Sequence, residues 1–286
     1  MTQNNNQRRA VKPFEELTYT DNFLFGEVMQ DEFTSKNVLE IILDIKIRKV
    51  VVLEKEKHID NIPDRKSIRL DIYLEDDEHT IYNIEMQVDD KHDIPKRSRY
   101  YQGLMDTKSL PTGAISYNSL NKSFVIFICL FDPFGYDRCF YSFEERCVED
   151  PSLSLGDETR KIFLNATGQN REGIREELQE FLDYIKNPSL TIIKSTKVQE
   201  LDNRVNKVKS NEKVRSKYMT LTNWILEERD IARTEGRAEG EKEGELKILI
   251  SLVKDGILSL DYAAQKANLT TEQFSEVMKQ NDCKEA

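Results

Sequence analysis

The pattern of apolar and polar residues over the first 150 positions changes its period several times, and each change marks an element. Apolar positions at helical spacing predict a helix over residues 35–43, with Ser35 as its N-cap. Alternating or continuous apolar runs predict strands at residues 49–53, 68–74, 81–88 and 124–131. Pro95 fits the first turn of a helix that continues to about Leu110. This order of elements predicts a mixed α/β core whose first strands are antiparallel.

After Pro151 the pattern becomes mostly helical, with helices predicted at residues 177–186 and 194–219 and two short ones around Gly256. Glycine recurs at positions 236, 240 and 244, and each glycine inside a helix costs roughly 1 kcal/mol relative to alanine. We therefore interpret residues 236–245 as a Gly/Glu-rich linker that forms at most a marginal helix. The predicted domains are residues 13–235, with a core at about 13–150, and a small helical C-terminal module at 246–286.

Composition and charge exclude several classes of protein. The 286 residues carry a net charge of -10, so the chain as a whole is not a basic nucleic-acid-binding surface. No apolar run approaches the roughly 18 residues of a membrane span, and the first residues lack the apolar stretch of a signal peptide. We therefore expect a cytoplasmic protein without a membrane segment. The four cysteines and three histidines have no spacing that indicates a disulfide framework or a zinc site.

Two acidic residues stand out on the predicted hairpin of residues 68–74 and 81–88. Both arms alternate, which places Asp71 on the polar face of the first strand and Glu85 on the polar face of the second. Pairing Asp71 opposite Glu85 keeps the apolar faces of both strands on the core, whereas a slip of one residue inverts a strand. The hairpin therefore brings two carboxylates together.

Facing carboxylates destabilise a sheet unless a cation offsets their repulsion. A divalent metal with oxygen ligands, Mg²⁺ or Mn²⁺, is the natural choice, and it would activate water and polarise a phosphoryl oxygen. The alternative interpretation is a solvated acidic hairpin whose side chains simply face water.

A wider set of motifs points to one family. Asp71, followed across a hairpin by Glu85-Met86-Gln87, resembles the D…(D/E)xK signature of the PD-(D/E)XK nuclease superfamily. The chain is closer still to its Rpn branch of recombination-promoting nucleases, also labelled PD-(D/E)XK nuclease family transposases. The motifs that carry this resemblance lie at residues 21–25, 69–73, 82–87, 97–102, 127–135, 211–219 and 234–245. The resemblance covers roughly residues 13–245 and implies a restriction-endonuclease-like core, a mixed sheet flanked by helices, with an α-helical C-terminal extension.

The resemblance also implies roles for individual residues. Asp71 and Glu85 would hold the metal together with the backbone carbonyl of Met86. Gln87 stands where the superfamily signature has lysine, and it would orient the attacking water. A further acid from the first helices often joins such sites. Glu40 is the first choice here, with Asp21 and Glu27 behind it, although surface or capping roles fit all three.

Basic residues supply two possible DNA contacts. Arg97, Arg99 and Tyr100 follow the second acidic strand on the next helix and would contact phosphates or bases; alternatively, this helix packs on the sheet while its arginines pair with acids. Residues 186–218 carry nine Lys/Arg against three Asp/Glu, a local +6, which suits either a DNA-facing helix or a solvated helix packed through its apolar residues.

The C-terminal module has an apolar stripe at residues 246, 249, 250, 253 and 257. A segment of about 40 residues can hardly bury such a stripe alone, so we expect it to pair with a second copy of the chain and form a homodimer.

Together these features predict a Mg²⁺-dependent DNA endonuclease that hydrolyses phosphodiester bonds. The resemblance links it to recombination and to mobile-element or defence roles. The alternative is a non-catalytic DNA-binding or regulatory protein that retains the nuclease fold.

Overall fold

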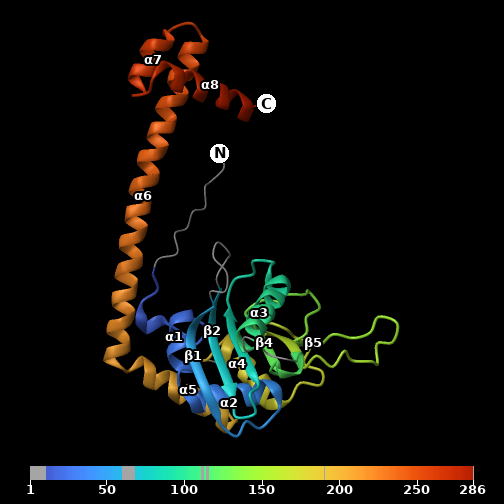
Figure 1. The fold of residues 1–286 in the computed structure, drawn as a ribbon. Coiled ribbons are helices and arrows are strands. Elements are labelled where there is room, and N and C mark those ends of the chain that lie inside the picture. Colours follow the sequence, from blue (N-terminus) through green and yellow to red (C-terminus); the bar gives the residue numbers. More distant parts are fainter. Residues whose placement is uncertain (1–10, 60–67, 111–112, 114–115, 190, 286) are drawn as a thin grey trace. The chain divides into compact units, whose positions relative to one another are not determined.

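A computed structural model describes residues 11–59, 68–110, 113, 116–189 and 191–285. The chain divides into two compact units, Met1–Tyr218 and Met219–Ala286 (Figure 1). The first unit holds the sheet and its flanking helices, and the second is helical. No helix among the described residues has both the length and the apolar character needed to cross a membrane.

The first unit is built on a six-stranded sheet with the order β1-β2-β3-β4-β6-β5. The strands are β1 (Val50–Ile59), β2 (Ile68–Asp76), β3 (Ile81–Gln87), β4 (Ser123–Cys129), β5 (Phe140–Phe143) and β6 (Thr159–Asn165). β1, β2 and β3 are antiparallel neighbours, β3, β4 and β6 are parallel, and β5 is antiparallel to β6. This confirms the predicted mixed α/β sheet with an antiparallel start.

Helices cover both faces of the sheet (Figure 1). One face packs on α1 (Asn22–Met29), α2 (Glu32–Leu43), α4 (Glu176–Lys186) and α5 (Thr196–Lys209), and the other packs on α3 (Ile94–Ser109). Two short 3-10 helices, η1 (Phe14–Glu16) and η2 (Tyr117–Ser119), complete this unit. Every residue of β4 is buried, as its continuous apolar run predicts for a central strand of a two-sided sheet.

The start of α2 differs from its prediction. Asp31 is the N-cap, and its carboxylate accepts the backbone N–H of Thr34 at 2.9 Å. Ser35 lies one turn inside the helix, where its hydroxyl donates to the carbonyl of Asp31 at 2.9 Å. The prediction of Ser35 as N-cap was wrong because the helix begins before its apolar stripe does, and aspartate is an equally strong cap.

The single helix predicted over residues 194–219 is two helices. α5 ends at Lys209, and α6 (Glu212–Lys254) begins after Ser210 and Asn211. The apolar side chains of α5, Val198, Leu201, Val205 and Val208, are all buried against the first unit's core. Several of the basic side chains pair with acids of the same unit: Lys197 with Glu40, Arg204 with Asp31, and Lys217 with Glu27. The packed interpretation of this basic segment is thus the one that the structure supports.

The sheet extends beyond residue 150, because β6 lies between β4 and β5. β6 begins with one polar and two charged residues and becomes buried only from Ile162 onward. Its burial therefore depends on pairing with β4, a partner distant in sequence.

The second unit has a small core of its own. Ile250 on α6, Ala263 and Ala264 on α7 (Leu260–Lys266), and Phe274 on α8 (Thr271–Glu285) are buried together. Leu246, Leu249 and Val253 pack against them, so most of the stripe expected to bind a second copy is covered within the chain. The predicted linker, residues 236–245, lies inside α6 and is helical. The domain boundaries themselves stay predictions.

Candidate active site

The acidic residues lie on the central hairpin of the sheet. β2 pairs with β3 so that Ile72 lies opposite Ile84 and Leu74 opposite Tyr82. These pairs are the ones that the alternation predicted. The same register, continued by one position, places Asp71 opposite Glu85.

At the acidic positions, side chains take part in joining the two strands. The backbone N–H of Asp71 donates to the carboxylate of Glu85 at 3.1 Å, and the backbone N–H of Met86 donates to the carboxylate of Asp71 at 3.2 Å. Each carboxylate thus accepts a backbone N–H from the opposite strand, which satisfies donors that would otherwise need another partner. The reciprocal bonds hold the two carboxylates next to each other.

The polar face of this hairpin is buried, contrary to the solvated alternative. Glu85 is 2% exposed and its neighbour Asn83 is fully buried, while Asp71 is partly exposed. Residues of α3, Tyr101 among them, pack in the cluster on this face of the sheet. Burial and the neighbouring Asp71 carboxylate raise the pKa of Glu85 well above its ordinary range, and Arg97 opposes this shift.

Two adjacent carboxylates, one of them buried, form a donor set that suits a hard divalent cation. Such a cation would offset their repulsion and the cost of burying a charge. Among the described residues no cluster of three His, Cys, Asp or Glu side chains could hold a metal. Further ligands would therefore be backbone carbonyls or water, which is common for Mg²⁺.

A cleft of about 470 Å³ opens over the acidic pair. Its lining residues come from the turn before α1, from β2 and β3, from the loop after β3 and from α3: Thr20, Asp21, Asn22, Asp71, Glu85, Met86, Gln87, Val88, Asp89, Lys91, Arg97 and Tyr101. The structure therefore places Asp71, Glu85, Met86, Gln87 and Arg97 around one cleft, and their roles stay predictions.

Of the three acids considered as additional ligands, only Asp21 lines the cleft. Its carboxylate also accepts the backbone N–H of Thr18 at 2.6 Å and pairs with Lys12 at 2.7 Å. The tertiary position of the segment before α1 brings Asp21 to the wall of the cleft, where it does not form a three-acid cluster with Asp71 and Glu85 among the described residues.

Glu40, the first choice from the sequence, lies outside the lining of the cleft. Its carboxylate accepts the backbone N–H of Ile47 at 3.0 Å and pairs with Lys197 at 3.1 Å. Glu27 is held by Lys55 at 2.9 Å and Lys217 at 2.6 Å. Although burial opposes the change, these basic partners lower the pKa of Glu27, as expected for a structural ion pair.

Arg97 is the basic residue of α3 that reaches the cleft. Its side chain is 20% exposed, and its Nη1 atom lies 3.9 Å from Asp93. Its Nε and Nη2 atoms are buried and have no hydrogen-bond partner among the described residues. The guanidinium lies 5.1 Å from the ring centre of Phe127 and 5.6 Å from that of Tyr101. Arg97 is therefore fixed on an aromatic support, with its positive charge at the wall of the acidic cleft.

Arg99 and Tyr100 do not line this cleft. Arg99 follows Arg97 by two residues and points about 200° away from it, and Tyr100 is exposed to solvent. Tyr101 does line it, because it follows Arg97 by four residues, one helical turn. The sequence analysis missed Tyr101, and this spacing is the signal that could have found it.

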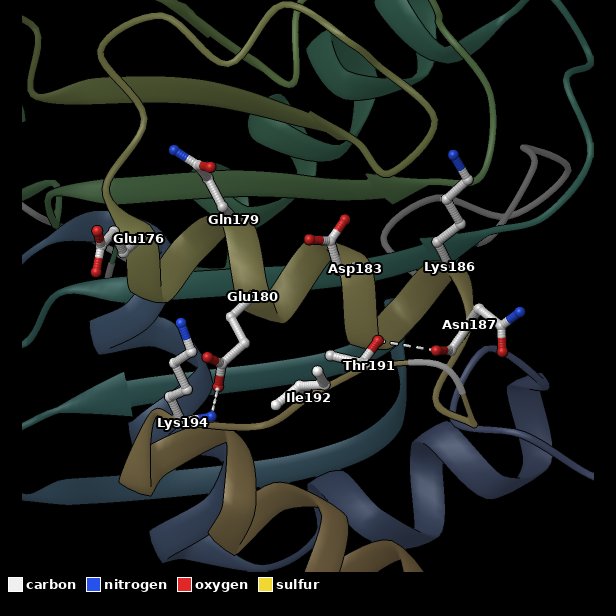
Figure 2. A pocket seen from close by; sticks show the side chains of 9 residues that line it. All are labelled: Glu176, Gln179, Glu180, Asp183, Lys186, Asn187, Thr191, Ile192 and Lys194. Carbon is white, nitrogen blue, oxygen red and sulfur yellow. Dashed lines mark hydrogen bonds between the residues drawn. The ribbon is translucent and has the colours of Figure 1, made fainter.

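A larger hollow of about 580 Å³ lies along α4 and the loop after it, and its acids have structural partners (Figure 2). Glu180 accepts the backbone N–H groups of Lys194 and Ser195 at 2.9 and 2.7 Å. Thr191 donates to the carbonyl of Asn187 at 2.8 Å. Asp183 pairs with Arg171. These contacts hold the loop against the helix, and the hollow lacks a facing pair of buried carboxylates.

Comparison with known proteins gives one match. The family model described as PD-(D/E)XK nuclease family transposase matches residues 19–218. No curated protein and no solved structure matches the chain. The matched segment contains the whole six-stranded sheet and the acidic cleft.

Proposed function

Because this chain belongs to the PD-(D/E)XK nuclease family of transposases, we propose that it is a metal-dependent DNA endonuclease that hydrolyses phosphodiester bonds. The observation that carries this proposal is the reciprocal bonding of Asp71 and Glu85, which fixes two carboxylates at the base of a cleft. In the proposed reaction a water oxygen attacks phosphorus, one P–O bond breaks, and the leaving oxygen takes up a proton. A role in recombination, in mobile elements or in defence is part of the proposal and rests on the family alone.

We propose Mg²⁺, or Mn²⁺, as the cofactor, bound by Asp71, Glu85 and the carbonyl of Met86. When bound, the ion would lower the pKa of water and stabilise negative charge on the phosphate. Asp21 lines the cleft and Glu40 does not, but no third acid among the described residues joins Asp71 and Glu85 in a metal-binding cluster, so the proposal keeps two acidic ligands.

The remaining residues orient the reactants. Gln87 is half-buried and lines the cleft, where its amide group can accept and donate hydrogen bonds to the attacking water. Arg97 would attract the phosphate through its charge and bind it through the exposed part of its guanidinium group. The phosphate would then be held between a fixed guanidinium and the acidic pair, an arrangement that supplies the proximity on which phosphoryl transfer depends.

The test is plasmid nicking by purified protein with Mg²⁺, with Mn²⁺ and with EDTA. Wild type should nick with either metal and not with EDTA. Asp71→Asn and Glu85→Gln should each slow nicking by about 10²-fold or more, because these isosteric changes keep the side-chain oxygen that accepts the backbone N–H and weaken the metal site.

Glu75→Gln is the matched control, since Glu75 lies on the same strand as Asp71 and outside the cleft. It should nick like wild type. Nicking by Asp71→Asn at the wild-type rate would refute the metal site. DNA binding without any nicking would favour a non-catalytic DNA-binding protein that retains the fold.

A further inference from the structure

A second hollow, of about 320 Å³, lies beside a different face of α3. Arg97 and Tyr101 face the acidic cleft, whereas Ser98 and Arg99 line this hollow. Its volume is at the lower end of the range for small-ligand pockets, which suits a small flat group. We call it the aromatic pocket, after the three phenylalanines described next.

The apolar wall of the aromatic pocket consists of Phe134, Phe143 and Phe163. The ring centre of Phe134 lies 5.0 Å from that of Phe143 and 5.1 Å from that of Phe163, with edge or tilted geometry. Phe163 is buried, whereas Phe143 is 44% exposed. The inner rings thus hold Phe143 in place while much of its own surface remains available to a ligand.

Charged side chains surround this wall. Arg99 and Lys161 line the pocket. Within the part of the chain that the structure describes, neither makes a hydrogen bond or a close ion pair, although the charge of Lys161 acts on Asp106. Glu145 is exposed and lines it as well. Glu144 also lines it, but Arg146 and Arg160 hold its carboxylate. The available groups are therefore two cations, one carboxylate and an aromatic surface.

We propose that the aromatic pocket binds an unpaired nucleobase of a DNA strand, an inference that rests on the proposed nuclease function for the choice of DNA. The base would stack on Phe143, and Arg99 and Lys161 would contact the phosphates on either side of it. Glu145 would accept a hydrogen bond from the amino group of adenine, cytosine or guanine, a group that thymine lacks.

The position of the pocket agrees with this assignment. Both hollows adjoin the first turns of α3, and a helix with its side chains is only about 10–12 Å wide. A DNA strand that crosses these turns would reach both hollows, so an unpaired base in the pocket would place a nearby phosphate at the acidic cleft. An apolar peptide would fill the aromatic surface but leave both cations without partners, which favours the nucleic acid.

The test measures DNA binding in EDTA, so that no strand is cut. Fluorescence anisotropy gives the Kd of the full chain for a labelled single-stranded oligonucleotide and for the blunt duplex of the same sequence. Wild type should prefer the single strand. Phe143→Ala should weaken single-strand binding by at least about fivefold, the lower end of what loss of one stacked base costs, and change duplex binding by less than about twofold.

Arg99→Gln is the second variant, because Arg99 is exposed and its substitution does not threaten the fold. It should weaken single-strand binding in the same direction. Tyr136→Ala is the control, since Tyr136 is an aromatic residue 76% exposed and outside the pocket. It should bind like wild type.

Three results would overturn the pocket: wild type without a preference for the single strand, Arg99→Gln with wild-type binding, or equal losses for single strand and duplex. If Phe143→Ala does not fold, the binding of Arg99→Gln decides the test.

Plasmid nicking in Mg²⁺ is measured in parallel with wild type and both variants. Nicking without a single-strand preference refutes the pocket alone, whereas a Phe143-dependent preference without nicking refutes the endonuclease alone.

Discussion

The backbone N–H of Asp71 donates a hydrogen bond of 3.1 Å to the carboxylate of Glu85, so the two acids of the candidate site are also partners in joining β2 to β3. Repulsion between the carboxylates and this backbone bond act in opposite directions on stability. A substitution to alanine removes both, whereas glutamine at position 85 removes only the charge. The isosteric variant therefore isolates the electrostatic contribution.

The first prediction concerns pH. The pKa of Glu85 is raised in the folded protein, so without metal the folded state holds a proton where the unfolded state has lost it. This contribution is fully present below the ordinary carboxyl range near pH 4 and is lost as pH rises through the raised pKa. Wild-type stability in EDTA should fall over this window, by at most about 1.4 kcal/mol per pH unit.

Glu85→Gln lacks this titration, so its stability should depend less on pH and exceed that of wild type at pH 8. Urea unfolding at pH 5, 6.5 and 8 measures the difference. A wild type that gains stability relative to the variant as pH rises would show that Glu85 is held in its charged form by other groups.

The second prediction concerns Gln87. Gln87→Lys introduces the lysine of the superfamily signature next to two acids, and the local charge becomes less negative where the phosphate binds. Nicking should be retained or faster. Gln87→Met keeps the size of the side chain but cannot orient water, and it should slow nicking by about 10²-fold. If Gln87→Lys loses as much activity as Glu85→Gln does, the site requires the neutral amide.

The third prediction concerns Arg97. Arg97→Gln should weaken DNA binding in EDTA by about tenfold or more, because a charge-assisted hydrogen bond contributes about 1.5–3 kcal/mol. Arg97→Lys should bind DNA little better than Arg97→Gln does, since an ammonium group cannot make the paired contacts of a guanidinium. Lys108→Gln, an exposed change near the end of the same helix, is the control for loss of charge. Equal effects of Lys108→Gln and Arg97→Gln would contradict a specific contact.

The fourth prediction concerns the dimer contact. Because most of the stripe at residues 246–257 is covered within the chain, we expect the contact at an earlier part of α6. Leu221, Trp224 and Ile231 are 39%, 58% and 53% exposed, and their spacing places them along one side of the helix. We expect the full chain to dimerise through this stripe, with Trp224→Ser and Ile231→Ser together giving a monomer by light scattering.

A chain that ends at Gly236 keeps these three residues and should remain a dimer. If this truncation is a monomer while the double variant is a dimer, the contact lies in the C-terminal module, as the sequence alone suggested. A monomeric wild type would refute the prediction of a dimer altogether.

The hairpin was predictable because local alternation and a short turn between Asp76 and Ile81 fix its register. β6 was missed because only Ile162, Phe163 and Leu164 form its apolar part, and a run this short becomes a strand through its pairing with β4. Which of the acids considered lines the cleft was not predictable for a similar reason. No local pattern distinguishes Asp21 from Glu40, and only the packing of the N-terminal segment on the sheet does.

Strand β3 joins two kinds of pairing that arise at different times during synthesis. Its antiparallel partner β2 precedes it by one turn, but its parallel partner β4 begins at Ser123, after the whole of α3 has been made. Local pairs form readily, whereas distant ones wait for the later segment and for closure of a longer loop. On a growing chain, Asp71 and Glu85 therefore meet while Glu85 is still exposed to water. Arg97 and the helix that covers Glu85 follow later, so the acidic cleft becomes complete only after much of the first unit has left the ribosome.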